Sequence, residues 1–321
     1  MEIVQSLVYG ILIGSLYGLA AAGLGLVFGV MRFLNIAHGY LLVLGGYVTY
    51  YLFSGGLVNI LGSESGNVHL FSIDFPAIWP FNQAPYGPFL SIIIVMIVLF
   101  GIGALLFKLI YGRLAALPEA GRIKNSLLVS FGLGLAIQQL AILSFSGDER
   151  TIPLNLGTIN ILGLRLPMIQ LMGLLIAFLL IILLNQFLTR TYFGKSVRAT
   201  SQDHEIASIM GINVKRTYLI SFSIGLALAG VAGTMLLLGY SITPTIGQQW
   251  TMKALVIIVL AGMGRISGVL YAGILLGVVE ALSVYLIPDG EPYREVVGLV
   301  LFILVLIFRP QGLFGRKAGE T

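Results

Sequence analysis

Long apolar runs constrain the fold of this chain more than any other feature of its sequence. Several of them exceed the ~18 consecutive apolar residues that a helix needs to span a lipid bilayer. Apolar residues make up 58% of the sequence and charged residues 10%, whereas a soluble domain usually contains about 25% charged residues. The sequence therefore predicts an all-α fold, a polytopic transmembrane helix bundle.

The apolar runs divide the chain into about eight or nine membrane spans, one of them short or broken. The expected spans cover residues 5–30, 36–53, 89–111, 125–145, 168–189, 217–240, 252–264, 269–287 and 294–309. The run at 252–264 is the short one, because it has fewer residues than a helix needs to cross the bilayer. We expect residues 1–321 to form a single transmembrane domain, with an outer loop at 54–88 and a charged cytoplasmic segment at 190–216.

The basic residues set the expected orientation of the bundle. If segment 190–216 is cytoplasmic, 14 of the 18 Lys and Arg residues fall on the inner side and four on the outer side. Cytoplasmic loops of membrane proteins carry such an excess of Lys and Arg. We therefore expect a multi-pass plasma-membrane protein whose N-terminus is outside and whose C-terminus is cytoplasmic. In such a protein the net charge of +5 reflects topology and does not indicate a nucleic-acid partner.

Segment 190–216 is expected to contain a short amphipathic helix with a mark at each end. Thr200 or Ser201 can cap its N-terminus, and Gly211 can take the left-handed conformation that ends a helix. Its apolar residues recur at helical spacing, so they share one face. The residues expected to contact a partner protein are Glu205, Ile206, Ala207, Ile209, Met210 and Gly211. The alternative is a solvated helix without a partner.

Polar residues within the apolar runs form a second group of candidates. Such residues are costly at membrane depth and usually face a cavity or a partner. Those expected to line or shape a translocation pathway are Asn35, His38, Gly39, Gln138 and Glu280. Segment 35–39 is either a tight cytoplasmic turn or a broken helix that enters the bundle core. Glu280 could instead form a structural ion pair with Lys253.

No residues indicate catalysis, a metal or a cofactor. Residues 193–196, Phe-Gly-Lys-Ser, look like the end of a phosphate-binding loop, but Thr189 stands where that motif needs its first glycine. The stretch also follows a membrane helix, where the motif requires a strand. The three histidines have no ligand-like spacing, and the chain has no cysteine, which excludes disulfides and thiolate metal sites.

Short motifs along nearly the whole chain carry a family resemblance. They are Tyr17-Gly-Leu-Ala20, Gly25-Leu-Val-Phe-Gly29, Asn35-Ile-Ala-His-Gly39, Gly45-Gly-Tyr47, Ala229-Gly-Val-Ala-Gly233, Met252-Lys-Ala254, Gly262-Met-Gly264 and Arg309-Pro-Gln-Gly312. Together they resemble the permease subunits of branched-chain amino acid ABC transporters, and the chain looks like the shorter of the two paralogous permeases in such systems. The stretch from Glu205 to Gly211 matches three of the four fixed positions of the EAA-x-x-x-G element that docks on the ATPase, and Ile206 departs from it.

The resemblance implies a permease of an ATP-driven importer that carries branched-chain or related amino acids and is not itself an enzyme. The implied partners are two ABC ATPase subunits, which bind the ATP, a paralogous permease subunit, an extracytoplasmic substrate-binding protein and the lipid bilayer. Urea, short amides or another small polar solute remain alternative substrates. An ion-coupled secondary transporter is the alternative class, and it predicts more intramembrane acids and no ATPase-docking helix.

Overall fold

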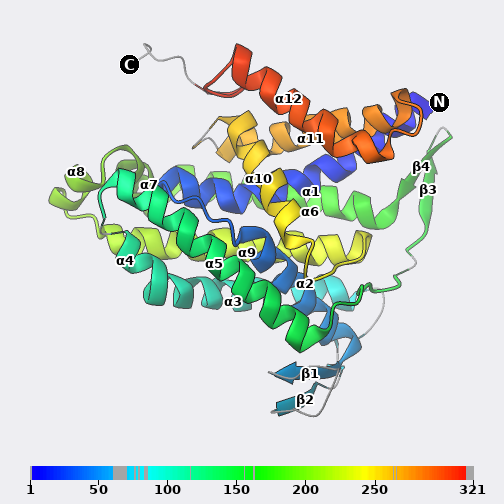
Figure 1. Cartoon of the computed structure of the whole chain (residues 1–321), viewed down its shortest axis with the longest axis horizontal. Coiled ribbons are helices and arrows are strands. Elements are labelled where there is room, and N and C mark those ends of the chain that lie inside the picture. The colour runs from blue at the N-terminus through cyan, green and yellow to red at the C-terminus, as the bar shows by residue number, and fades with distance from the viewer. Residues whose placement is uncertain are drawn as a thin grey trace. The chain divides into compact units, whose positions relative to one another are not determined.

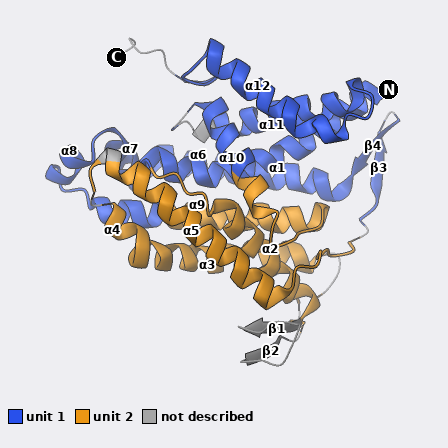
Figure 2. Ribbon diagram, in the orientation of Figure 1, with its two compact units in different colours: residues 1–32, 156–221, 252–321 blue, residues 33–155, 222–251 orange. Residues whose placement is uncertain are grey.

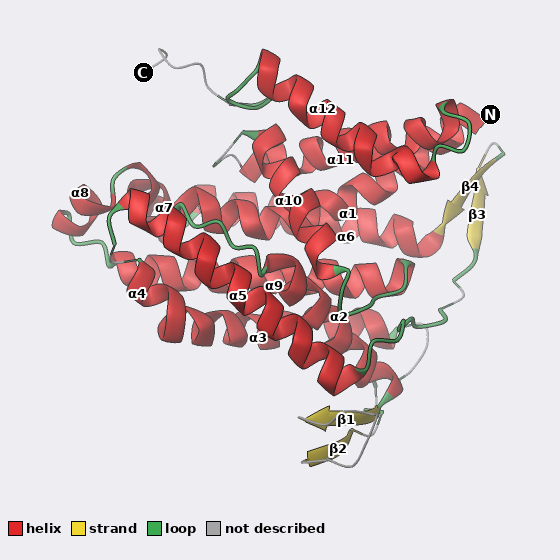
Figure 3. Cartoon of the chain, in the orientation of Figure 1, coloured by secondary structure: helices red, strands yellow, loops and turns green. Residues whose placement is uncertain are grey.

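The computed structural model describes residues 2–60, 71–75, 77–78, 80–82, 86–115, 117–154, 156–161, 163–262, 264 and 266–315. Helices make up most of this part of the chain, and its strands form two short hairpins (Figure 3). The expected outer loop at 54–88 is described only in part. The C-terminal tail from residue 316, which we expect in the cytoplasm, lies outside the described residues.

A helix occupies each of the nine expected spans (Figure 1). These helices are α1 (Glu2–Met31), α2 (His38–Ser54), α3 (Gly87–Leu106), α5 (Glu119–Phe145), α6 (Met168–Arg190), α9 (Val214–Gly239), α10 (Gly247–Ala261), α11 (Ile266–Leu286) and α12 (Arg294–Phe308). By length and composition, six helical segments can cross a membrane, and they involve α1, α3, α5, α6, α9 and α11. Helices α2, α10 and α12 have 17, 15 and 15 residues. A polytopic bundle is therefore confirmed, whereas the count of eight or nine spans is not.

The connections between these helices contain several short elements. A π-helix at Phe107–Tyr111 joins α3 to α4 (Gly112–Leu114), and a 3-10 turn at Glu291–Tyr293 precedes α12. Helices α7 (Tyr192–Gln202) and α8 (His204–Ile209) follow α6. The hairpins β1–β2 (Gly56–Ile60 and Phe71–Phe75) and β3–β4 (Thr158–Ile161 and Leu164–Pro167) are antiparallel and were not predicted.

The chain divides into two compact units (Figure 2). Unit 1 comprises residues 1–32, 156–221 and 252–321, and unit 2 comprises residues 33–155 and 222–251. Helices α9 and α10 each have residues in both units. Segment 190–216 and α11 belong to unit 1, and the segment between α1 and α2 belongs almost entirely to unit 2.

Glycines bring α1 and α11 together in unit 1. A Cβ atom on Gly14 would lie 2.6 Å from the Cα of Ile274, and one on Gly10 would lie 2.5 Å from the Cα of Val278. Gly277 on α11 faces the backbone of Gly14 just as closely. Small residues at four-residue spacing allow such close approach of membrane helices. The glycines of α1 and α11 therefore allow the two helix backbones to pack in direct contact.

Unit 2 uses glycines in the same way between α2 and α9. A Cβ atom on Gly45 would lie 2.5 Å from the Cα of Gly230. The two helices are also joined by a hydrogen bond of 2.7 Å between the hydroxyls of Thr49 and Thr234, both fully buried. These contacts fix α2, whose first residues carry part of the candidate site.

Candidate functional site

The segment between α1 and α2 is irregular and buried. Helix α1 ends at Met31, and Arg32 has a positive φ of 58°, a conformation that is uncommon for residues with a side chain. Phe33, Asn35 and Ala37 are fully buried. Non-helical backbone at membrane depth is tolerated only where it is buried in protein or lines a water-filled cavity. The segment satisfies the first of these conditions.

Hydroxyl side chains supply the hydrogen bonds that the irregular backbone needs. The amide of Leu34 donates to Ser126 Oγ at 3.3 Å, and the amide of Ile36 donates to Ser130 Oγ at 3.0 Å. Ser130 Oγ in turn donates to the carbonyl of Leu34 at 3.1 Å. These two serines are one turn apart on α5, so a single helix face pairs the backbone of this segment.

Thr251 pairs the same segment from α10. Its Oγ1 atom donates to the carbonyl of Ile36 at 3.0 Å and accepts from the amide of Gly39 at 2.9 Å. A Cβ atom on Gly39 would collide with the carbonyl oxygen of Gly247 and with Thr251. Gly39 is therefore required by the close approach of α2 to the first turn of α10.

Asn35 is the buried polar side chain of residues 32–37, the segment between α1 and α2 that we call the break. Its Oδ1 atom accepts from the hydroxyl of Tyr111 at 3.0 Å and from the amide of Ala37 at 3.1 Å. Its Nδ2 atom is buried and has no hydrogen-bond partner among the described residues. His38, three residues further along the chain, is also fully buried. A buried amide without a partner loses its hydrogen bonds to water, so its donors are available to a water molecule or a solute.

The other two pathway candidates are Gln138 and Glu280. Gln138 lies on α5, half-buried, in unit 2, and Glu280 lies on α11 in unit 1. The structure thus brings Asn35, His38 and Gly39 together in unit 2. It does not place Glu280 in the same unit as those three residues.

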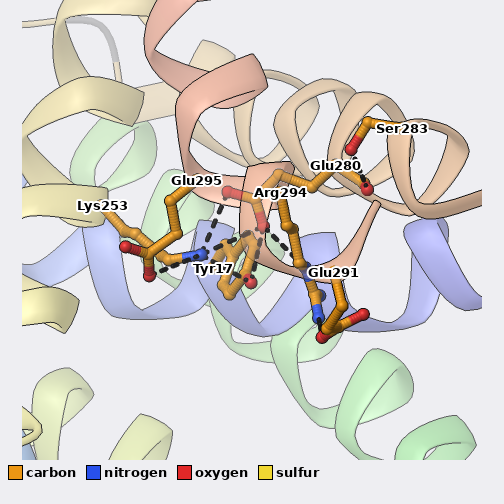
Figure 4. A network of polar contacts seen from close by, with 7 residues as sticks. All are labelled: Tyr17, Lys253, Glu280, Ser283, Glu291, Arg294 and Glu295. Carbon is orange, nitrogen blue, oxygen red and sulfur yellow. Dashed lines mark hydrogen bonds and ion pairs between the residues drawn. The ribbon is translucent and has the colours of Figure 1, made fainter. Parts of the chain in front are cut away.

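Glu280 is the centre of an ion-pair network in unit 1 (Figure 4). Its carboxylate lies 3.0 Å from Lys253 Nζ and 3.3 Å from Arg294 Nε, and it accepts from the Tyr17 hydroxyl at 2.9 Å. The expected pairing of Glu280 with Lys253 is confirmed. Arg294 and Tyr17 were not predicted as partners, because nothing in the sequence spacing links α1 and α12 to this carboxylate.

The network runs from a buried carboxylate to exposed ones. The side chain of Glu280 is 2% exposed and that of Lys253 is 18% exposed, whereas that of Glu295, 4.0 Å from Lys253, is 59% exposed. Glu291, also exposed, lies 3.6 Å from Arg294. A buried carboxylate is tolerated when it is paired and hydrogen-bonded. Two cations and a hydroxyl meet that condition here and tie α1, α10, α11 and α12 together.

Segment 190–216 contains α7, α8 and the start of α9. Helix α8 carries four of the six predicted docking residues, and Met210 and Gly211 directly follow its end. Asp203 caps α8, since its Oδ1 atom accepts from the amides of Glu205 at 2.8 Å and Ile206 at 3.0 Å. The predicted caps, Thr200 and Ser201, lie instead within α7, so that prediction is wrong. Asparagine and aspartate are as good as serine at this position, and Asp203 lies two residues closer to the apolar run than Ser201 does.

The C-terminal end of α8 confirms the prediction made for Gly211. Gly211 has a φ of 85°, the left-handed conformation expected after the helix. Asn213 caps α9, where its Oδ1 atom accepts from the amide of Arg216 at 3.0 Å. Ile206, Ile209 and Met210 are 60%, 84% and 77% exposed. Ala207 is buried within the chain, so its side chain does not belong to the exposed apolar face.

The ion-pair network generates a prediction about stability. Glu280→Gln leaves Lys253 and Arg294 close together without a buried carboxylate, and breaking a buried pair costs about 3–5 kcal/mol. Lys253→Met should cost less, because Arg294 and Tyr17 still neutralise and hydrogen-bond Glu280. The control is Glu295→Gln, whose exposed pair is worth about 0–1 kcal/mol. Thermal unfolding of the purified protein measures all three, and equal midpoints for Glu280→Gln and Glu295→Gln would contradict the prediction.

Comparison with known proteins identifies the family of the chain. The family described as branched-chain amino acid transport system / permease component matches residues 6–306. The chain is 30% identical to the high-affinity branched-chain amino acid transport system permease protein BraD of Pseudomonas aeruginosa, over 98% of this chain and 97% of that protein. It is 29% identical to the permease protein LivH of Escherichia coli K12, over 98% of this chain and 96% of LivH.

A second permease of the same Escherichia coli transport system, LivM, is also similar. It is 32% identical over 151 residues, which are 46% of this chain and 34% of LivM. No solved structure matches the chain. Because the family match covers almost the whole sequence, the chain belongs to the family of permease components of branched-chain amino acid transport systems.

Proposed function

We propose that the chain is the membrane-spanning permease of an ABC importer that carries branched-chain or related amino acids. The observation that carries the proposal is α8, a short helix outside the membrane spans. Ile206 and Ile209 on this helix, together with Met210 directly after it, expose an apolar face. An apolar helix face of this kind fits a groove on a soluble protein. The relatives' names, which specify high-affinity branched-chain amino acid transport, support the substrate class.

The proposal divides the work of transport among several chains. Residues 1–321 act as one permease domain, which forms the pathway and catalyses no reaction. Two ABC ATPase subunits bind the ATP, a paralogous permease completes the membrane pathway, and an extracytoplasmic binding protein delivers the substrate. The comparisons do not favour urea or short amides as substrates. An ion-coupled transporter has no ATPase partner, so it does not require an exposed docking helix such as α8.

The proposed orientation places the N-terminus outside and segment 190–216 in the cytoplasm, as the distribution of basic residues indicates. The cysteine-free chain allows single cysteines to test it. Asn160→Cys on β3 and Gln202→Cys at the end of α7 both change exposed residues. A membrane-impermeant maleimide should label Asn160→Cys on intact cells and Gln202→Cys only after permeabilisation. The reverse pattern would invert the topology and remove α8 from the ATPase side.

Asn35, His38 and Gly39 are proposed to line the translocation pathway. The buried, unpartnered Nδ2 atom of Asn35 supports this role. Asn35→Leu keeps most of the volume and removes the polar group, so we expect uptake to fall by about tenfold, equivalent to ~1.4 kcal/mol. Tyr111→Phe is the control, because it removes one hydrogen bond to Asn35 and leaves the amide in place.

Substrate uptake into proteoliposomes that contain the assembled complex distinguishes the two variants. Gly39 is unsuitable for this test, since any side chain there collides with Gly247 and would impair folding. If Asn35→Leu transports as well as Tyr111→Phe at equal levels of assembled complex, the break is a structural turn and the pathway lies elsewhere.

Helix α8 is proposed to couple the permease to its ATPase. Burying an isoleucine side chain is worth about 1.5–3 kcal/mol, so Ile209→Asp should weaken ATPase binding by roughly tenfold or more. Glu205→Arg reverses a charge at the helix N-terminus, where negative charge is favourable. Ser208→Asp introduces the same charge as Ile209→Asp on an exposed residue of α8 and removes no apolar surface.

Copurification of the ATPase and receptor-stimulated ATP hydrolysis in proteoliposomes measure the coupling. We expect Ile209→Asp and Glu205→Arg to lower both, while Ser208→Asp retains most of each. Full copurification and full stimulation with Ile209→Asp and Glu205→Arg would move the coupling element to another cytoplasmic segment, such as residues 113–124.

A further inference from the structure

The loop that follows α5 is tied to the segment between α9 and α10. Arg150 and Ile242 exchange both of their backbone hydrogen bonds, each at 2.9 Å, and form an isolated antiparallel bridge. The Nη2 atom of Arg150 also donates to the carbonyl of Phe145 at 3.1 Å and to Ser146 Oγ at 3.2 Å. We call residues 146–154, which contain this attachment, the strap.

The strap begins at a strained residue. Ser146 directly follows α5 and has a φ of 65° and a ψ of 170°, a backbone conformation that is essentially restricted to glycine. Residues in such a conformation cost free energy and persist only where the surrounding structure enforces them. The bridge between Arg150 and Ile242 is one of the constraints on Ser146, so breaking it allows the strain to relax.

Two buried hydrogen-bond donors are left unpaired where the strap meets α2. The Nε atom of Arg150 and the hydroxyl of Tyr47 are buried and have no hydrogen-bond partner in the part of the chain that the structure describes. The Tyr47 ring stacks on that of Phe145 at 4.5 Å between centroids, and the Arg150 guanidinium lies 5.6 Å from the centre of the Tyr50 ring. A buried donor without a partner has lost its hydrogen bonds to water. The closed strap therefore carries a cost that contact with water removes.

The attachment of the strap is small. Apart from the bridge and the bonds of the Arg150 guanidinium, Ile152 is the one strap residue that is buried, at 2% exposure. Asp148, Glu149 and Thr151 are exposed. Segments with few buried apolar contacts open locally at low free energy. Weak attachment, a strained first residue and unpaired donors together describe a segment that is poised to open.

The bridge lies at one end of the segment that leads to the pathway candidates. Ile242 belongs to residues 240–246, which join α9 to α10, and its Cδ1 atom lies 3.0 Å from the Cβ position of Gly46 on α2. The other end of this segment reaches Gly247, which packs against Gly39. All of these residues belong to unit 2. The strap thus fastens one end of a segment whose other end contacts a proposed pathway residue.

We propose that the strap is the outer gate of the permease, and that it must release Ile242 before an amino acid enters. The proposal rests on the proposed function, whose orientation places residues 146–154 on the outer side. The binding protein delivers substrate on that side, so the segment that closes unit 2 there opens and shuts in each transport cycle. Opening exposes Ile242 and hydrates Arg150 and Tyr47, and closing buries them again.

A disulfide beside the bridge tests the gate in this cysteine-free chain. Thr151 and Ser241 form the next facing pair beyond the antiparallel bridge. Because the bridge residues exchange both hydrogen bonds, the side chains of the next pair approach more closely. We expect the oxidised Thr151→Cys/Ser241→Cys transporter to lose uptake in proteoliposomes that are supplied with binding protein and ATP. Reduction of the disulfide should restore uptake.

The β3–β4 hairpin supplies a matched control for the disulfide. Asn160 and Arg165 face each other across its two strands, and both are exposed. Oxidation of the Asn160→Cys/Arg165→Cys transporter should therefore leave uptake unchanged.

Labelling of a buried position tests the opening itself and does not depend on a disulfide. Ile242 and Leu237 on α9 are both fully buried. A membrane-impermeant maleimide added on the outer side should label Ile242→Cys during uptake, because the open strap exposes this residue. Leu237→Cys should stay unlabelled under the same conditions.

Two results would overturn the proposal. They are full uptake after mass spectrometry has shown the Thr151–Ser241 disulfide, and no labelling of Ile242→Cys in a preparation that takes up amino acids. If the disulfide does not form, the labelling decides alone. Either result together with normal wild-type uptake rejects the gate and leaves the proposed function standing, whereas absence of wild-type uptake rejects the proposed function itself.

Discussion

The need to pair every backbone polar group away from water governs the part of this molecule that matters most for function. Between Met31 and His38 the pattern of helical backbone hydrogen bonds is interrupted in a buried region. Each backbone amide or carbonyl that loses its helical partner there is costly unless another group pairs with it. Three hydroxyls, from Ser126, Ser130 and Thr251, provide the missing bonds. The positions of α5 and of the first turn of α10 in unit 2 follow from this requirement.

The helices could be predicted from the sequence because long apolar runs are a strong and local signal. The polar residues of the break and the pair Lys253–Glu280 were also visible, since isolated polar groups in apolar runs are conspicuous. The hydroxyls that pair the break were not, because Ser126 and Thr251 are ordinary residues in their own helices and lie far from it in sequence. The β3–β4 hairpin was missed for another reason, as strands of four residues are too short to stand out.

Charge is arranged differently at the two candidate regions. The carboxylate of Glu280 is buried and joined to cations from α10 and α12, so it fixes elements relative to one another within unit 1. On α8 the acidic residues sit at the helix start, where Asp203 caps the backbone and Glu205 is exposed. The first arrangement favours rigidity within a unit. The second presents a small preformed helix whose apolar residues remain available to another protein.

The glycine seam between α1 and α11 has a consequence for how this sequence can diverge. Gly14 faces Gly273 and Ile274, and Gly277 faces Gly14, at distances that leave no space for a methyl group on either side. A methyl group on one helix therefore forces the other helix outward. No smaller residue on the facing helix can make room for it, because the atoms in contact belong to the backbone. We therefore expect these glycines to change together. Substitutions among related sequences should either leave all of them in place or replace the whole seam.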